Sequence, residues 1–205
     1  MSTERTIHWY EDADEAKKVS AESGKPILMF FHSVHCAGCL NTFEKTLRRM
    51  SVVDSINDHF VPLVFEVSEM PKFAEHYNIE WTPTFIVADM GGHEHYRWEG
   101  YLPEDDYLAH VTMGLARLAL KKGEYKEAER RLDEMLIKFP LSDLAAEASY
   151  YLGVAKYRGS QDSNWLLRTY EEMKTRYPDS VWTIKASVFT KEDFKRVEES
   201  LRMAA

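Results

Sequence analysis

The sequence predicts two domains: an α/β domain with a mixed sheet and helices on both faces over residues 1–110, and an all-α helical-repeat domain over residues 111–205. Three observations lead to this prediction. Apolar runs of strand length alternate with helical spacing in the first part, whereas the second part has no strand signal and repeats itself. The charge also changes: residues 1–110 carry 9 Lys and Arg against 19 Asp and Glu, and residues 111–205 carry 17 against 15.

The first elements follow from apolar spacing and from glycine and proline positions. Residues 12–22 predict a short surface helix that ends at Gly24, because glycine readily adopts the left-handed conformation that follows a helix. The apolar run 27–31 has the length of a buried strand. Residues 36–50 place apolar side chains at helical spacing and predict a second helix.

The remaining elements of the first domain are predicted in the same way. Residues 61–67 form a second apolar run, and its proline stands near the start, where a strand tolerates a missing N–H donor. Residues 71–77 predict a short helix. The runs 84–88 and 95–98 flank a Gly-Gly pair and predict a hairpin. A helix from residue 103 then continues unbroken to Lys122, which would join the two domains as one rigid body.

The second domain contains an internal repeat. Residues 114–123 are matched 37 residues further on by residues 151–160, and Phe-Pro or Tyr-Pro ends each unit. A period in the thirties with helix, turn, helix and a proline stop is typical of a helical solenoid. Residues 112–190 resemble the tetratricopeptide repeat family. A last helix, capped at Thr190 and ending near Met203, is predicted to close the array.

The chain has two cysteines, Cys36 and Cys39, at the predicted start of the helix that follows the first strand. Thiols three positions apart can form a disulfide with little backbone movement, and N–H groups at a helix start favour a thiolate at Cys36. So short a loop would add little to stability as a cross-link. The spacing therefore predicts redox chemistry rather than a structural disulfide.

Thr82-Pro83 is the second informative motif, directly before the run 84–88 and 47 residues beyond Cys36. Together with the cysteine pair and the glycine after the hairpin, it makes residues 5–110 similar to the thioredoxin superfamily. The resemblance implies that the Thr82–Pro83 bond is cis, that this turn lies against the cysteines, and that its peptide groups bind the substrate. Trp81 would border the same groove. An ordinary turn before a strand is the alternative interpretation.

The resemblance implies a thiol–disulfide oxidoreductase that acts on protein disulfides without a cofactor or a bound metal. Cys36 would attack the disulfide as a thiolate, and Cys39 would resolve the mixed disulfide. An imidazolium at His35 would favour the Cys36 thiolate, although a solvated His35 without a role is an equal alternative. An upstream thiol reductant would restore the pair, and the helical repeats would select the protein partner.

Two departures from the family leave other hypotheses open. Phe30 stands where thioredoxins keep a buried aspartate, and Val64 where its lysine partner is expected, so turnover should be slower. Water, His32 or a backbone route would have to accept the Cys39 proton. These departures favour a redox-sensing or redox-inert adaptor that binds partners through its repeats. A third, weaker hypothesis is a zinc site formed by four side chains: His32, His35, Cys36 and Cys39.

Composition and charge limit the other classes of partner. The net charge is −8 and the first domain is acidic, which argues against nucleic acid, because phosphate binding needs clustered cations. No apolar run approaches the roughly 18 residues of a membrane span. The stretch Met1–Arg5 leads into polar sequence without the apolar core of a secretory signal, so we expect a cytoplasmic protein.

Overall fold

A computed structural model describes residues 5–204, apart from the side chains at 198, 201, 203 and 204. The chain divides into two compact units between Leu118 and Ala119. The first four residues, on which the prediction about a secretory signal partly depends, lie outside the described part. None of the described helices is both long and apolar enough to cross a membrane.

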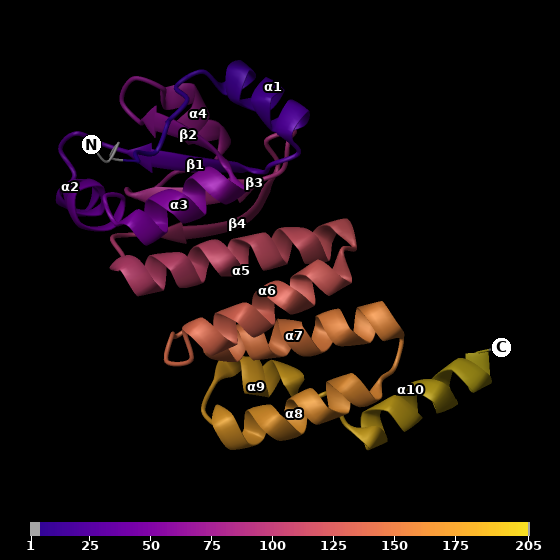
Figure 1. The fold of residues 1–205 in the computed structure, drawn as a ribbon. Coiled ribbons are helices and arrows are strands. Elements are labelled where there is room, and N and C mark those ends of the chain that lie inside the picture. Colours follow the sequence, from indigo (N-terminus) through magenta and orange to yellow (C-terminus); the bar gives the residue numbers. More distant parts are fainter. Residues whose placement is uncertain (1–4, 205) are drawn as a thin grey trace. The chain divides into compact units, whose positions relative to one another are not determined.

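The first unit contains the predicted mixed sheet (Figure 1). Its four strands are β1 (Ile27–His32), β2 (Val61–Glu66), β3 (Thr84–Ala88) and β4 (Glu94–Glu99), and their order in space is β2-β1-β3-β4. β2 runs parallel to β1, whereas β3 is antiparallel to β1 and β4 is antiparallel to β3. A mixed four-stranded sheet is therefore confirmed.

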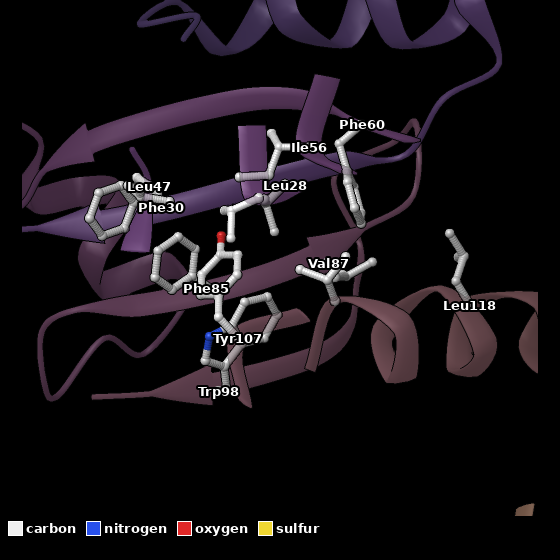
Figure 2. Close-up of a cluster of buried hydrophobic side chains, with 12 residues drawn as sticks. Leu28, Phe30, Leu47, Ile56, Phe60, Phe85, Val87, Trp98, Tyr107 and Leu118 are labelled. Carbon is white, nitrogen blue, oxygen red and sulfur yellow. The ribbon is translucent and has the colours of Figure 1, made fainter. Parts of the chain in front are cut away.

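Strand β1 is buried on both faces of the sheet, and every residue from Ile27 to Phe31 is at most 1% exposed. Alternate side chains of a strand point to opposite faces. Leu28 and Phe30 accordingly belong to one hydrophobic cluster, and Met29 and Phe31 to another. Figure 2 shows the first of these clusters, in which Phe30 lies among side chains from several elements.

Helices cover both faces of the sheet. α3 (Met50–His59) and α5 (Glu104–Lys122) contribute to the cluster around Phe30. α1 (Ala13–Ser23) and α4 (Pro71–His76) pack on the other face, against the cluster around Phe31. The side chain of Asp12 accepts two N–H groups at the start of α1, and Gly24 at its end has the left-handed φ of 72° that the sequence predicted.

The single helix predicted over 36–50 is wrong. The segment forms α2 (Ala37–Asn41), then one π-helical turn, η1 (Thr42–Thr46), and then leaves the helix before α3 begins. The Leu47 N–H donates to the Thr42 carbonyl five residues earlier at 2.9 Å, which makes the turn wider than an α-helical one. Thr46 Oγ1 also donates to the Leu102 carbonyl at 2.6 Å, a contact with a distant segment that helical spacing alone does not reveal.

α3 itself was missed. Its apolar residues recur at helical spacing, with Val52, Val53 and Ile56 buried, so a signal was present in the sequence. Met50, the first residue of α3, is also the last residue of the helix predicted over 36–50.

The second unit is all-helical, as predicted. α6 (Tyr125–Lys138) packs against α7 (Ala145–Ser160), and α7 packs against α8 (Asn164–Arg176), as Figure 1 shows. The short α9 (Val181–Ala186) was not predicted. α10 (Lys191–Ala204) closes the described chain.

The predicted ends of these helices agree with the structure. α6 and α8 stop at the aromatic residue before a proline, Phe139 and Tyr177 respectively. Thr190 Oγ1 accepts the Asp193 N–H at 3.1 Å, so α10 has the predicted cap. α5 crosses residue 110 without a break, as expected. The rigid connection between the domains, and a domain boundary at residue 110, stay predictions.

Gly153 allows α7 and α8 to pack closely, and replacing it should destabilise the second unit. A Cβ atom there would lie 2.1 Å from Thr169 Oγ1 and 2.7 Å from Thr169 Cβ. We expect Gly153→Ala to reduce the free energy of unfolding by about 1–3 kcal/mol, as overpacked cores do. Chemical denaturation measures this change.

The matched control is Gly159→Ala on the same helix, where the added Cβ would meet Tyr125 Cβ at 3.3 Å. This variant should have close to wild-type stability, since the higher helix propensity of alanine offsets a small displacement. Equal stability of the two variants would show that the approach of α7 and α8 does not need Gly153.

Candidate redox site

Cys36 caps the N-terminus of α2. Its backbone is extended, with φ −99° and ψ 114°, and its Sγ accepts the Cys39 N–H at 3.1 Å. The Leu40 N–H donates to the Cys36 carbonyl at 3.1 Å. Both thiols are free; Cys36 is partly exposed, whereas Cys39 is 1% exposed. One sulfur can therefore meet a partner, and the other lies one helical turn behind it.

The Thr82-Pro83 turn lies against the cysteine pair. The Cys36 thiol donates to the Thr82 carbonyl at 3.2 Å, and the Thr82–Pro83 bond is cis, the isomer that the resemblance implies. A Cβ atom on Gly38 would lie 3.1 Å from Pro83 Cδ and 3.7 Å from Cys36 Sγ. A small residue at position 38 thus lets the two segments approach each other.

A groove of about 510 Å³ begins at Cys36. Trp81 is 67% exposed and Tyr101 is 37% exposed on its border, which leaves aromatic surface beside the thiol. Ile79 and Glu80, the two residues before Trp81, also line the groove, and no motif of the sequence predicts their place there. The groove is lined by residues from the cysteine loop, the segment before β3 and the turn after β4: Cys36, Ala37, Gly38, Val67, Ile79, Glu80, Trp81, Thr82, Pro83, Gly100 and Tyr101.

Phe30 belongs to β1, the strand that leads to the cysteines, and lies in a buried aromatic cluster. It is fully buried and stacks on Phe85, with ring centroids 4.4 Å apart and an interplanar angle of 3°. The residue opposite Phe30 on β2 is Val64, as the sequence analysis expected. A ring and an isopropyl group thus fill the space that a buried charged pair would need.

Comparisons with known proteins agree with this geometry. Residues 13–113 match the family described as "Thioredoxin-like domain". This part of the chain is a thioredoxin-like domain. No curated protein sequence matches the chain.

Three solved structures are similar to part of the chain. A thioredoxin from Thermus thermophilus is 25% identical, with a TM-score of 0.51, over 58% of this chain and 95% of that one. A DsbH oxidoreductase is 17% identical, with a TM-score of 0.49, over 54% of this chain and 85% of that one. A thioredoxin-fold protein from Helicobacter pylori is 19% identical, with a TM-score of 0.44, over 69% of this chain and 93% of that one.

The two thiols of the thioredoxin-like domain ionise very differently. Burial opposes ionisation of Cys36, but hydrogen bonds outweigh it and lower the pKa of Cys36 below its ordinary value. These hydrogen bonds come from the side chains of Cys39 and Thr82 and from two backbone N–H groups. Burial, together with the hydrogen bond to Cys36, raises the pKa of Cys39 to about 11. The exposed thiol is therefore the better nucleophile.

The two histidines near the cysteines, His32 and His35, differ in their exposure to solvent. His35 is exposed, and its backbone N–H lies 3.3 Å from Ser33 Oγ; its tuning role stays a prediction. His32 packs between the rings of Phe30 and Phe43, and burial lowers the pKa of His32. In the described part of the chain, no three His, Cys, Asp or Glu side chains are placed to share a metal ion, so the zinc hypothesis finds no support.

The titration of the thiols can be measured directly. We expect alkylation of reduced protein to modify Cys36 at a pH below the range of an ordinary thiol, and Cys39 only as the pH approaches about 11. Iodoacetamide labelling followed by mass spectrometry, repeated across pH, gives both curves.

Two variants of Cys39 test the cause. Cys39→Ala removes a hydrogen-bond donor to the Cys36 sulfur and should raise the pKa of Cys36. Cys39→Ser keeps a donor and should raise it less. Identical titration of Cys36 in the two variants would show that the side chain at position 39 does not stabilise the thiolate.

Proposed function

We propose that the thioredoxin-like domain is a thiol–disulfide oxidoreductase that acts on protein disulfides. The observation that carries the proposal is the asymmetry of the pair: Cys36 is partly exposed with a lowered pKa, and Cys39 is buried with a raised pKa. Attack by a thiolate on a disulfide needs this division between a nucleophile and a resolving thiol. Similarity to a thioredoxin supports the same activity.

The reaction has two exchange steps. The Cys36 thiolate attacks one sulfur of the partner disulfide, forms a mixed disulfide and releases the other partner sulfur as a thiolate. Cys39 then loses its proton and attacks Cys36 Sγ, which forms the Cys36–Cys39 disulfide and releases the second partner sulfur. The partner gains two electrons and the domain loses two. An upstream thiol reductant returns them, which suits a reducing compartment such as the cytoplasm.

Among the residues that the structure describes, no Asp or Glu is buried and could accept the proton of Cys39. Phe30 occupies the aromatic cluster beneath the pair, and the strand opposite carries Val64. Water entering from the groove, His32, a backbone route or the first partner thiolate that leaves would then take this proton. We expect turnover slower than that of an enzyme with a buried aspartate.

We also propose that the helical unit selects the protein partner, and that its helices are arranged as tetratricopeptide-like repeats. A groove of about 370 Å³ among α6, α7 and α8 supports it. The cations of Lys156 and Arg168 lie 5.1 and 5.4 Å from the ring centroid of Trp165 in this groove. Within the described residues neither cation makes an ion pair, so both can bind carboxylates of a protein partner.

An adaptor is the second candidate function, with thiols that sense redox state or have no role. The replacement of a buried carboxylate by Phe30 is the observation that favours it, because the proton path of a thioredoxin is lost while the groove of the helical unit remains. The two candidates differ in whether partner capture depends on the thiols.

Cysteine variants test the enzyme. Cys36→Ser should abolish reduction of insulin disulfides, because serine at pH 7 is a very weak nucleophile. Cys39→Ser should accumulate mixed disulfides, because the resolving thiol is absent. Turbidity of insulin measures the first effect, and non-reducing electrophoresis measures the second. Undiminished insulin reduction by Cys36→Ser would refute the proposed enzyme.

The same variants separate the candidates. Partners held by Cys39→Ser but not by the double cysteine variant support the oxidoreductase; partners held equally by both support the adaptor. Adding Lys156→Gln and Arg168→Gln should reduce capture if the helical groove selects partners. Arg130→Gln is the matched control, because Arg130 lies outside that groove and pairs with Glu127.

A further inference from the structure

The groove beside Cys36 has one charged side chain. Of the described residues that line it, Glu80 alone carries a formal charge when Cys36 is protonated, and no lysine or arginine is among them. Glu80 is exposed and directly precedes Trp81. A peptide segment bound here would meet an apolar surface and a single carboxylate. The apolar lining comes from Val67, Ile79, Trp81, Pro83 and Tyr101.

A second carboxylate is held near the cysteine loop. Glu66 Oε1 accepts the N–H of Val34, two residues before Cys36, at 3.4 Å. Its other oxygen accepts the backbone N–H groups of Ser68 at 2.7 Å and Glu69 at 3.0 Å. Hydrogen bonds from Ser68 lower the pKa of Glu66, so this carboxylate is charged at neutral pH. Negative charge therefore lies in the groove, at Glu80, and also beside the cysteine loop, at Glu66.

The basic side chain near Glu80 is already bound elsewhere. The Arg97 guanidinium forms an ion pair with Glu94 and donates to the Tyr77 carbonyl at 2.8 Å. A further contact, at 3.5 Å, joins it to the Asn78 carbonyl. Glu80 interacts with Arg97 through charge alone and makes no ion pair with any described residue, so its carboxylate oxygens are available to a partner.

We propose that the preferred substrate of this site is a protein disulfide flanked by an apolar residue and a lysine or arginine, with the cation facing Glu80. This inference rests on the proposed function. Apolar side chains would cover the aromatic surface beside Cys36, and an acidic flank would be repelled by both carboxylates. An exposed charge pair of this kind changes a rate by about two- to fivefold. The Cys36 thiolate attracts any cation, whereas Glu80 favours one position.

Two cystine peptides test the proposal. They share the same length and apolar residues and differ only in a lysine or a glutamate beside the cysteine. The measurement is kcat/KM for each peptide at low salt, expressed as the ratio of the lysine peptide to the glutamate peptide. Wild type is compared with Glu80→Gln, Glu80→Lys and the matched control Glu75→Gln. Glu75 is exposed on α4 and does not line the groove.

The expected ratio exceeds one in wild type, falls about two- to fivefold in Glu80→Gln and falls further in Glu80→Lys. It should stay at the wild-type value in Glu75→Gln and shrink toward one at high salt. Equal effects of Glu80→Gln and Glu75→Gln would overturn the proposal, because net charge alone would then explain the preference. Wild type that reduces both peptides equally would overturn this inference alone, whereas wild type that reduces neither would overturn the proposed function with it.

Discussion

The complete burial of β1 is the constraint on which the rest of the first unit depends. The strand pairs with β2 on one side and β3 on the other, and its residues 27–31 are at most 1% exposed. A strand in this position needs apolar side chains on both faces and helices over both. The two hydrophobic clusters follow from it. So does the location of the redox site, because the loop that carries Cys36 begins where this strand ends.

The same constraint explains the chemistry beneath the cysteines. A buried ion pair stabilises a fold only when its geometry compensates for the loss of hydration, and a close-packed apolar pair avoids that cost. Phe30 and Val64 form such an apolar pair, and Phe30 stacks on Phe85 within the cluster drawn in Figure 2. The domain thus combines an ionisable, partly exposed thiol with an interior in which no described carboxylate is buried.

The features that the sequence predicted correctly depend on residues that are close together in the chain. The apolar runs predicted all four strands, Gly24 predicted the end of α1, and Thr82-Pro83 predicted the turn at the cysteines. The π-helical turn at 42–46 was not predicted, because the spacing of apolar residues reveals neither the wider turn nor the contact of Thr46 with Leu102. The place of Glu80 in the groove was not predicted for a related reason. Glu80 and Cys36 belong to two segments that only the fold brings together.

The sulfur of Cys36 is also the cap of a helix, and this links two equilibria. If the N–H groups at the start of α2 favour the thiolate, the thiolate favours the first turn of α2 by the same free energy. A sulfur bonded to a partner carries no charge and accepts the Cys39 N–H more weakly. The mixed disulfide therefore lowers the cost of local opening in the turn that holds Cys39. In the proposed reaction, each cycle would loosen the backbone around Cys39 when that thiol has to move, and restore it when the Cys36 thiolate returns.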